Sequence, residues 1–257
     1  MKRAIVIGAT SGIGREVACR LAGEGWLVGA CGRREALLQA LQAAAPAGRI
    51  VIQPLDVTDP QAPERLQELI ERMGGMDLFF LASGIGNQNP SLQPDVELHT
   101  LRTNGEGFVR MVVTAFNHFK AQASQAGQQA RSGGHIAVIS SIAGTKGLGM
   151  APAYSATKRM QNTYIEALAQ LSRMQHLHIR FTDIRPGFVD TDLLSGKRYP
   201  LLMPVERVAN RIMKAIHSSE RRCPRYRIIV IDGRYRLLVF FWRLIPRQLW
   251  ERLPIRN

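Results

Sequence analysis

One stretch near the start of the chain decides the fold: Ala4-Ile5-Val6-Ile7-Gly8-Ala9-Thr10-Ser11-Gly12-Ile13-Gly14. Its four apolar residues predict a short buried strand, and the glycines predict a tight turn into a helix over residues 13–22. Glycines here let the chain turn sharply, approach a phosphate closely and pack the helix on the strand. The helix N-terminus would offer free N–H groups to an anion. The stretch predicts a dinucleotide-binding unit; the alternative is that the glycines serve turn geometry alone.

The remaining chain repeats this alternation of strand and helix. Apolar runs predict strands over residues 26–31, 49–55, 77–82, 135–140, 178–184 and 226–231. Helical patterns cover residues 34–45, 60–73, 96–121, 152–174 and 205–219, whereas residues 122–134 predict a loop or a frayed helix end. Continuous apolar strands separated by helices indicate an α/β fold. We expect a Rossmann-type, doubly wound parallel sheet of about seven strands with helices on both faces. Residues 1–234 would form one domain, with residues 235–257 as its tail.

The charge of the chain is uneven. The formal net charge is +14 over 257 residues, and the last 38 residues hold ten arginines against three acidic residues. A basic tail suits an anionic partner such as a phospholipid surface; the alternative is a solvated basic surface. No nucleic-acid-binding module is recognisable, so no specific nucleic-acid partner is expected.

The cysteines and the chain start bear on compartment and metals. Cys19, Cys31 and Cys223 show no C-x-x-C or ligand-like spacing, so neither a metal site nor a disulfide framework is expected. A first strand that begins by residue 3 leaves no room for a signal peptide. The longest apolar run is broken at Arg243, well short of the ~20 residues of a membrane span. We expect a cytoplasmic protein.

The end of the second predicted strand bears on cofactor choice. It reads Ala30-Cys31-Gly32-Arg33-Arg34, with a glycine where an acidic residue would bind the ribose hydroxyls of NAD. A guanidinium can bind a 2′-phosphate, which a carboxylate would repel. The sequence therefore favours NADP(H), with Arg33 as the first candidate for the phosphate contact and Arg34 as the second.

The strongest chemical signal is Tyr154-Ser155-Ala156-Thr157-Lys158. Positions i and i+4 share one helix face, so the phenol and the ammonium can share a pocket. A nearby ammonium lowers the pKa of a tyrosine toward the range that proton transfer needs. Ser141, thirteen residues before Tyr154, ends the fifth strand, where ligands bind in open parallel sheets. Its hydroxyl could polarise a substrate carbonyl.

Together these motifs resemble the short-chain dehydrogenase/reductase family over residues 3–232, including its G-x-x-x-G-x-G turn. The resemblance implies hydride transfer between nicotinamide and a carbonyl or alcohol, with Tyr154 as acid/base, assisted by Lys158 and Ser141. It also implies that Asn104, in the predicted helix 96–121, holds a water that relays protons to the lysine. The alternative for Asn104 is an exposed polar residue.

The resemblance further implies a set of cofactor-binding residues. They are Gly8, Thr10, Ser11, Gly12, Ile13 and Gly14 at the phosphates, Arg33, Arg34, Asp56, Val57 and Gly84 at the adenosine, and Tyr154, Lys158, Pro186, Gly187, Val189 and Thr191 near the nicotinamide. Asp56 could instead cap the next turn. Two departures from the family are Ile7, where a threonine is usual, and Leu81-Ala82-Ser83-Gly84, where Asn-Asn-Ala-Gly is usual. We expect the second to affect stability more than chemistry.

Substrate and partners are less determined. The segments 142–153 and 188–204 carry apolar residues that suggest a lipophilic substrate, unless they serve packing: Leu148, Met150, Phe188, Leu193, Leu194, Leu201 and Met203. Residues 235–253 interleave aromatic and aliphatic side chains with arginines, so they either pack on protein or lie on the inner face of a membrane. The resemblance implies a homodimer or homotetramer paired through residues 96–121 and 152–174. A nucleotide-sensing regulator without turnover is the second functional hypothesis, although such proteins usually lose the tyrosine or lysine.

Overall fold

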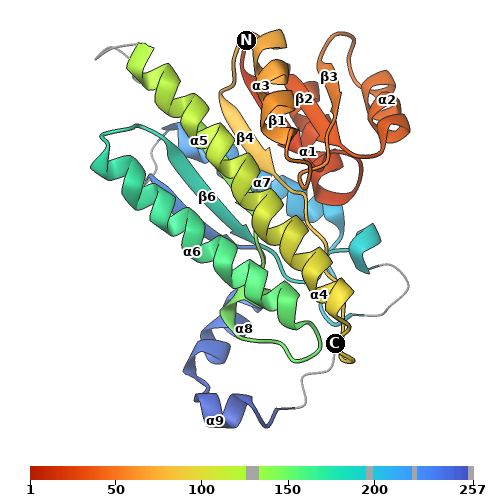
Figure 1. The fold of residues 1–257 in the computed structure, drawn as a ribbon, viewed down its shortest axis with the longest axis vertical. Helices are drawn as coiled ribbons and strands as arrows, with labels where there is room; N and C mark the ends of the chain where they lie inside the picture. The colour runs from red at the N-terminus through yellow and green to blue at the C-terminus, as the bar shows by residue number, and fades with distance from the viewer. Residues whose placement is uncertain (126–132, 195–198, 222–224, 254–257) are drawn as a thin grey trace.

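The computed structural model describes residues 1–125, 133–194, 199–221 and 225–253. Its centre is one parallel sheet in the order β3-β2-β1-β4-β5-β6-β7 (Figure 1). The strands are β1 (Arg3–Ile7), β2 (Leu27–Gly32), β3 (Ile50–Pro54), β4 (Leu78–Leu81), β5 (His135–Ile139), β6 (Arg180–Arg185) and β7 (Tyr226–Val230). The predicted doubly wound sheet is confirmed.

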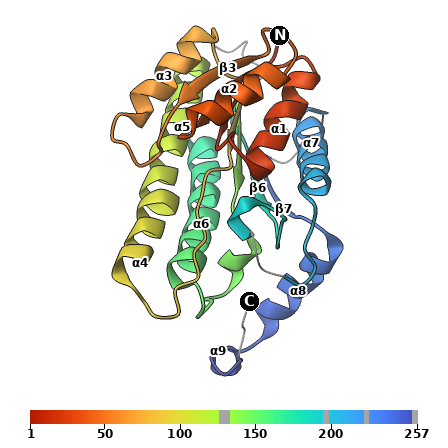
Figure 2. The ribbon, with the colours of Figure 1, turned by 90° about the vertical axis from the view of Figure 1, so that its right-hand side faces the viewer.

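Helices cover both faces of this sheet (Figure 2). One face packs against α1 (Gly12–Gly23), α2 (Glu35–Ala44) and α7 (Val205–Arg221). The other packs against α3 (Ala62–Arg72), α5 (Phe108–Gln125) and α6 (Pro152–Met174). Because neighbouring strand residues point to opposite faces, Val6 joins the first core and Ile7 the second. This two-sided burial explains why the strands are continuous apolar runs.

The predicted helix over residues 96–121 is confirmed in its extent, since the chain is helical from Pro94 to Gln125, but the sequence did not predict the change of helix type within it. The chain forms α4 (Pro94–Leu101), then a π-helical turn η1 (Arg102–Gly107), and only then α5. Gly107 packs so tightly that a Cβ there would lie 2.7 Å from Cγ2 of Val57. Because Gly107 and Val57 are far apart in the chain, the apolar pattern of the helix does not indicate this contact. Of residues 122–134, predicted as a loop or a frayed helix end, those as far as Gln125 continue α5, and residues 126–132 lie outside the described residues.

The C-terminal segment folds back onto the domain as α8 (Gly233–Leu244) and α9 (Arg247–Trp250). Tyr235 and Val239 on α8 are buried in the first core. The segment also binds the loop after β5, because Lys146 Nζ donates to the Ile245 carbonyl (2.9 Å) and Trp250 Nε1 to the Gly147 carbonyl (2.8 Å). One face of α8 therefore packs on protein. Within the described residues, no helix has both the length and the apolar character needed to cross a membrane.

Candidate active site

The glycine-rich turn lies between β1 and α1, at the carboxyl end of the sheet. Gly8 and Gly12 adopt positive φ angles of 90° and 53°. A Cβ on Gly14 would collide with the Gly8 carbonyl oxygen, so only glycine lets α1 approach the strand this closely. Ser11, the residue before the helix, makes no side-chain cap, and the first-turn N–H groups remain available to an anion. The turn has the geometry that a pyrophosphate needs.

The end of β2 faces this turn, where Gly32 lies close to the Thr10 side chain. A Cβ on Gly32 would lie 2.6 Å from Cγ2 of Thr10. Arg34 Nη2 donates to Thr10 Oγ1 (3.0 Å) and Ser11 Oγ (2.8 Å). Arg33 instead lies 3.8 Å from an Asp56 carboxylate oxygen. Both arginines border the turn, and Arg34, the second candidate from sequence, makes the direct contacts with it.

Asp56 performs the turn-capping role that the sequence left as an alternative. Its Oδ1 accepts hydrogen bonds from the Thr58 main-chain N–H (2.9 Å) and hydroxyl (2.8 Å). Partial burial tends to raise the pKa of Asp56, but the Thr58 hydrogen bonds and the Arg33 charge outweigh it, so that the pKa is lowered. The carboxylate is therefore ionised and held at the end of β3, with Val57 behind it against Gly107.

The proposed catalytic side chains meet beside the glycine-rich turn. Ser141 follows β5, and its hydroxyl accepts a hydrogen bond from Ala143 N–H (3.1 Å), which opens the short 3-10 helix η3 (Ile142–Thr145). The Ser141 side chain also lies close enough to Tyr154 on α6 to lower the pKa of its phenol. Lys158 Nζ lies 5.7 Å from the centroid of the Tyr154 ring. The structure thus brings together three residues that the sequence places on two separate elements.

The protonation states of these groups follow from burial. Burial raises the pKa of Tyr154, and the nearby Ser141 side chain lowers it only in part. The expectation of a lowered Tyr154 pKa is therefore wrong for the cofactor-free protein. Burial also lowers the pKa of Lys158 to about 8, against the opposing effect of the Asp183 carboxylate. At neutral pH the site holds a protonated phenol beside an ammonium, which suits donation of a proton to a substrate oxygen.

Asn104 lies in the π-helical turn and is completely buried, so the alternative of an exposed polar residue is wrong. Its side-chain oxygen accepts from Ile85 N–H (2.9 Å), and its nitrogen donates to the Ile85 carbonyl (2.7 Å). These bonds hold the loop after β4 next to the site. A Cβ on Gly84 in that loop would lie 3.6 Å from Lys158 Nζ.

The segment after β6 closes the site opposite the glycine-rich turn. Val189 forms a bridge with Met203, where Asp190 N–H donates to the Met203 carbonyl (2.9 Å). The Thr191 methyl carbon would lie 3.0 Å from a Cβ on Gly12. Of the residues predicted after β6, Thr191 therefore lies against the glycine-rich turn.

Comparison with known proteins identifies the family. Residues 2–200 match the family described as short chain dehydrogenase. The chain belongs to the short-chain dehydrogenase family. It is 35% identical over 204 residues to a Myxococcus xanthus protein named an uncharacterized oxidoreductase. The matched residues make up 78% of this chain and 77% of that protein.

Two solved structures share the fold of this short-chain dehydrogenase. The 3-ketoacyl-(acyl-carrier-protein) reductase of Brucella melitensis, complexed with NADH, has a TM-score of 0.77 at 21% identity over 90% of this chain and 97% of the other. An alcohol dehydrogenase of Thermococcus sibiricus, complexed with 5-hydroxy-NADP, has a TM-score of 0.75 at 20% identity over 91% and 97%. Since the two hold different nicotinamide cofactors, the likeness does not choose between NAD and NADP for this chain.

Tyr235 was not predicted as part of the site of this short-chain dehydrogenase. Its hydroxyl accepts from Phe188 N–H (3.1 Å) and donates to the Leu201 carbonyl (3.0 Å). A Cβ on Gly187 would collide with its ring. The tail helix α8 thus holds the segment after β6, and no local signal in the sequence indicates this contact.

A buried ion pair beneath the site was also missed. Asp183 on β6 accepts two hydrogen bonds from Arg185 (2.8 and 2.6 Å) and one from the Ser140 hydroxyl. The amide of Asn162, with its nitrogen toward Asp183, completes the cluster. The sequence did carry a signal for this ion pair, since two charged residues lie in a strand predicted to be buried and buried charges require partners.

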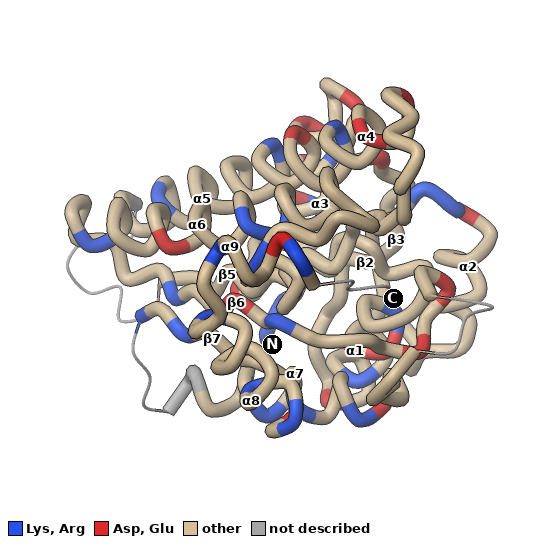
Figure 3. Tube along the Cα trace, turned by 90° about the horizontal axis from the view of Figure 1, so that it is seen from below, with Lys and Arg blue, Asp and Glu red and all other residues tan. Residues whose placement is uncertain are grey.

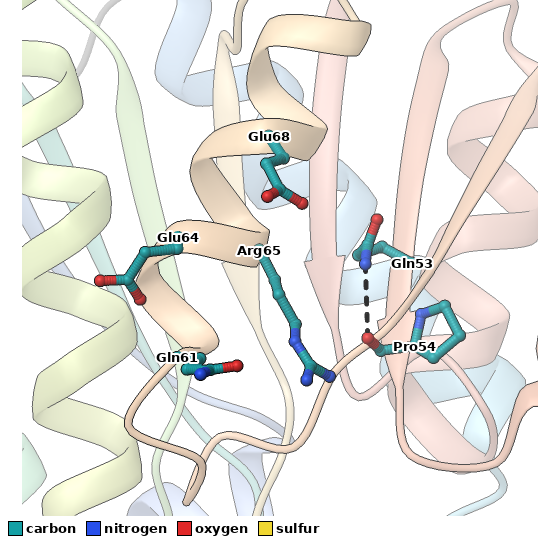
Figure 4. Close-up of a pocket in the computed structure, with 6 residues that line it drawn as sticks. All are labelled: Gln53, Pro54, Gln61, Glu64, Arg65 and Glu68. Atoms are coloured by element: carbon teal, nitrogen blue, oxygen red, sulfur yellow. Dashed lines mark hydrogen bonds between the residues drawn. The ribbon is translucent and has the colours of Figure 1, made fainter.

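A separate hollow of about 550 Å³ lies between β3 and α3 (Figure 4). It is lined by Gln53, Pro54, Gln61, Glu64, Arg65 and Glu68. None of these belongs to the predicted site, and Arg65 is already paired with Asp59 at 3.3 Å. The residues that line this hollow include no tyrosine, lysine or serine of the kind proposed for catalysis.

Proposed function

We propose that the chain is an NADP(H)-dependent oxidoreductase that transfers a hydride between nicotinamide and the carbonyl or alcohol of an apolar substrate. The observation that carries this proposal is the cluster of Ser141, Tyr154 and Lys158 beside a phosphate-binding turn. The NADP(H) preference is supported by Gly32, which puts no carboxylate there to repel a 2′-phosphate, and by the two arginines that follow it.

Each residue has a role in the reduction of a carbonyl. Nicotinamide, when bound, supplies the hydride to the carbonyl carbon. Ser141 donates a hydrogen bond to the carbonyl oxygen, and Tyr154 gives that oxygen its proton. The Lys158 ammonium stabilises the phenolate left behind. Cellular NADP pools are usually reduced, so reduction is the proposed direction.

The segments around the site support an apolar substrate. Phe188 stacks on Tyr199 with ring centroids 4.7 Å apart. Leu148 and Met203, on the two segments predicted to line the substrate site, are buried. Leu193 and Leu201, in contrast, are exposed on the segment that closes the site. An apolar ketone or aldehyde could bind such a surface, whereas the buried members serve packing.

The cofactor proposal predicts a selective loss of NADPH affinity. Arg33→Ala and Arg34→Ala should each weaken NADPH binding by about 10–100-fold, because a hydrogen bond to a charged group contributes roughly 1.5–3 kcal/mol. NADH affinity should change little. Titration followed by nicotinamide fluorescence measures both cofactors, with Arg173→Ala at the exposed end of α6 as the control.

Two outcomes would contradict the proposal. Preference for NADH in the wild type would overturn the assignment of the arginines. Tight NADPH binding with no turnover across a panel of lipophilic ketones and aldehydes would favour a nucleotide-sensing regulator, the second hypothesis.

The outer face of α8 supports a further partner. Leu237, Phe240, Phe241 and Leu244, at i, i+3, i+4 and i+7, form one stripe, with Phe240 56% and Leu244 62% exposed. Buried Tyr235 and Val239 occupy the opposite face. Arg234, Arg236 and Arg243 lie on the same helix, among the lysines and arginines that Figure 3 marks in blue. This pattern suits an anionic lipid surface. We therefore place the enzyme in the cytoplasm, with α8 on the inner face of a membrane.

Vesicle sedimentation tests the lipid surface. The wild type should pellet with vesicles that contain phosphatidylserine, and less at high salt, because arginines contribute to the attraction. Phe240→Ser with Phe241→Ser should stay in the supernatant, while Leu37→Ser with Leu92→Ser, at two exposed positions elsewhere, should pellet as the wild type does. Wild-type protein that ignores anionic vesicles would rule out this partner. Point changes are preferable to deletion, since Tyr235 belongs to the core.

A groove of about 630 Å³ supports self-association. It lies between η1, α5 and α6 and is lined by Leu101, Gly105, Glu106, Val109, Arg110, Ala156, Thr157 and Met160. We propose that a second copy covers it, giving a homodimer or homotetramer through these helices. The molar mass from light scattering decides between this assembly and a monomer.

A further inference from the structure

Gln161 is a buried amide in the centre of the proposed site. It lies on α6, three residues after Lys158, and is 1% exposed. Its oxygen accepts a hydrogen bond from Lys158 Nζ (3.0 Å), and its nitrogen donates to the Asn104 main-chain carbonyl (2.8 Å). An amide satisfied at both ends is inexpensive to bury, but it becomes costly when one partner is lost.

The other bond of Lys158 shows what this amide does. Lys158 is 4% exposed, and its ammonium also donates to the Ile139 carbonyl at the end of β5 (3.1 Å). An ammonium has three N–H donors. Two of them are held by the Ile139 and Gln161 oxygens, which locates the charge 5.7 Å from the Tyr154 ring centroid.

The second hydrogen bond of Gln161, to Asn104, depends on the π-helical turn. Such turns interrupt the regular i→i−4 ladder and occur often at functional sites. The carbonyl of Asn104, in the middle of η1, accepts the Gln161 amide. The side chain of the same residue holds the loop after β4, so Gln161 connects Lys158 to that loop as well.

We infer that Gln161 is a positioning residue, which clamps the Lys158 ammonium between the main chains of η1 and β5 for proton transfer by Tyr154. The inference rests on the proposed reduction. A neutral amide holds the ammonium in place without adding a negative charge beside it. Among the described residues, the hydrogen bonds of the Gln161 side chain go to Lys158 and Asn104, so Gln161 acts on Tyr154 through Lys158.

If Gln161 served packing alone, substitutions at position 161 would leave the pKa of Lys158 unchanged. If it positions the ammonium, they would shift that pKa. The ionisable groups that face Lys158 are Tyr154 on α6 and Asp183 on β6, and Asp183 is paired with Arg185. The loop after β4 and the π-helical turn contribute neutral Gly84 and Asn104. Burial already lowers the pKa of Lys158 to about 8, so a substitution at position 161 would change the charge of Lys158 near neutral pH.

The decisive experiment is a ¹³C NMR titration of the lysine Cε signals in the full chain, with Lys158 assigned by Lys158→Arg. Gln161→Leu removes an acceptor of the charged form and should lower the Lys158 pKa by about one unit. Gln161→Glu places a carboxylate there and should raise the pKa by roughly 1–3 units. The same two substitutions at exposed Gln170, on the same helix, should leave it unchanged.

The pH profile of turnover gives the second readout. With NADPH and a carbonyl probe such as 4-nitrobenzaldehyde, Gln161→Leu should lower kcat about tenfold at neutral pH and move the alkaline limb to lower pH. Gln161→Glu should move that limb to higher pH. Unchanged Lys158 titration in both variants would overturn the inference. If the wild type reduces no carbonyl, the proposed function fails, while the NMR titration still decides whether Gln161 holds Lys158.

Discussion

Tyr154→Phe is expected to lower kcat for carbonyl reduction by about 10²–10⁴-fold, the usual contribution of a positioned general acid. Phenylalanine keeps the ring beside Lys158 and Gly86, where a Cβ would lie 3.0 Å from the tyrosine ring. It removes only the hydroxyl, whose pKa the nearby Ser141 side chain lowers. NADPH affinity should therefore stay within a few-fold of the wild type, as nicotinamide fluorescence would measure.

The matched control is Tyr164→Phe on the same helix. Tyr164 packs edge-on against Phe108 with centroids 6.2 Å apart, away from Lys158. Its loss of a hydroxyl should leave kcat unchanged. If Tyr154→Phe kept more than half of the wild-type rate, another group would have to supply the proton, and the proposed mechanism would be wrong.

Asp183→Ala is expected to lower the free energy of unfolding by about 3–5 kcal/mol, because it leaves a buried charge without its partner. The Arg185 side chain is 9% exposed and donates two hydrogen bonds to Asp183. The Ser140 hydroxyl loses its acceptor as well. Urea denaturation followed by tryptophan fluorescence measures the change.

A paired substitution separates the buried charge from the loss of packing. Asp183→Leu with Arg185→Met removes both charges and should destabilise less than Asp183→Ala, because no charge remains unpaired. Asp190→Ala, at an exposed position after the same strand, should change stability by less than about 0.5 kcal/mol. A value for Asp183→Ala within that same range would show that the ion pair contributes little.

Several features follow from sequence because their causes are local. The run Ala4–Ile7 and the glycines after it specify a strand, a turn and a helix through residues that are neighbours in the chain. Helix α6 begins and ends where the pattern predicts, at residues 152 and 174, with Pro152 in its first turn. Tyr154 and Lys158 share a face because an α-helix repeats every 3.6 residues.

The tertiary structure decided the rest. The Gln161 amide binds a carbonyl 57 residues earlier, and the Tyr235 hydroxyl binds one 34 residues earlier, so neither contact leaves a local pattern. The π-helical turn, whose last residue Gly107 packs on Val57, lies inside a stretch whose periodicity predicts one helix. The direction of the Tyr154 pKa depends on burial, which is a property of the assembled core. Short-range patterns therefore predicted the sheet and the helices that cover it, and they named the candidate site residues. The hydrogen-bond partners and electrostatics of those residues arose from contacts between residues far apart in the chain.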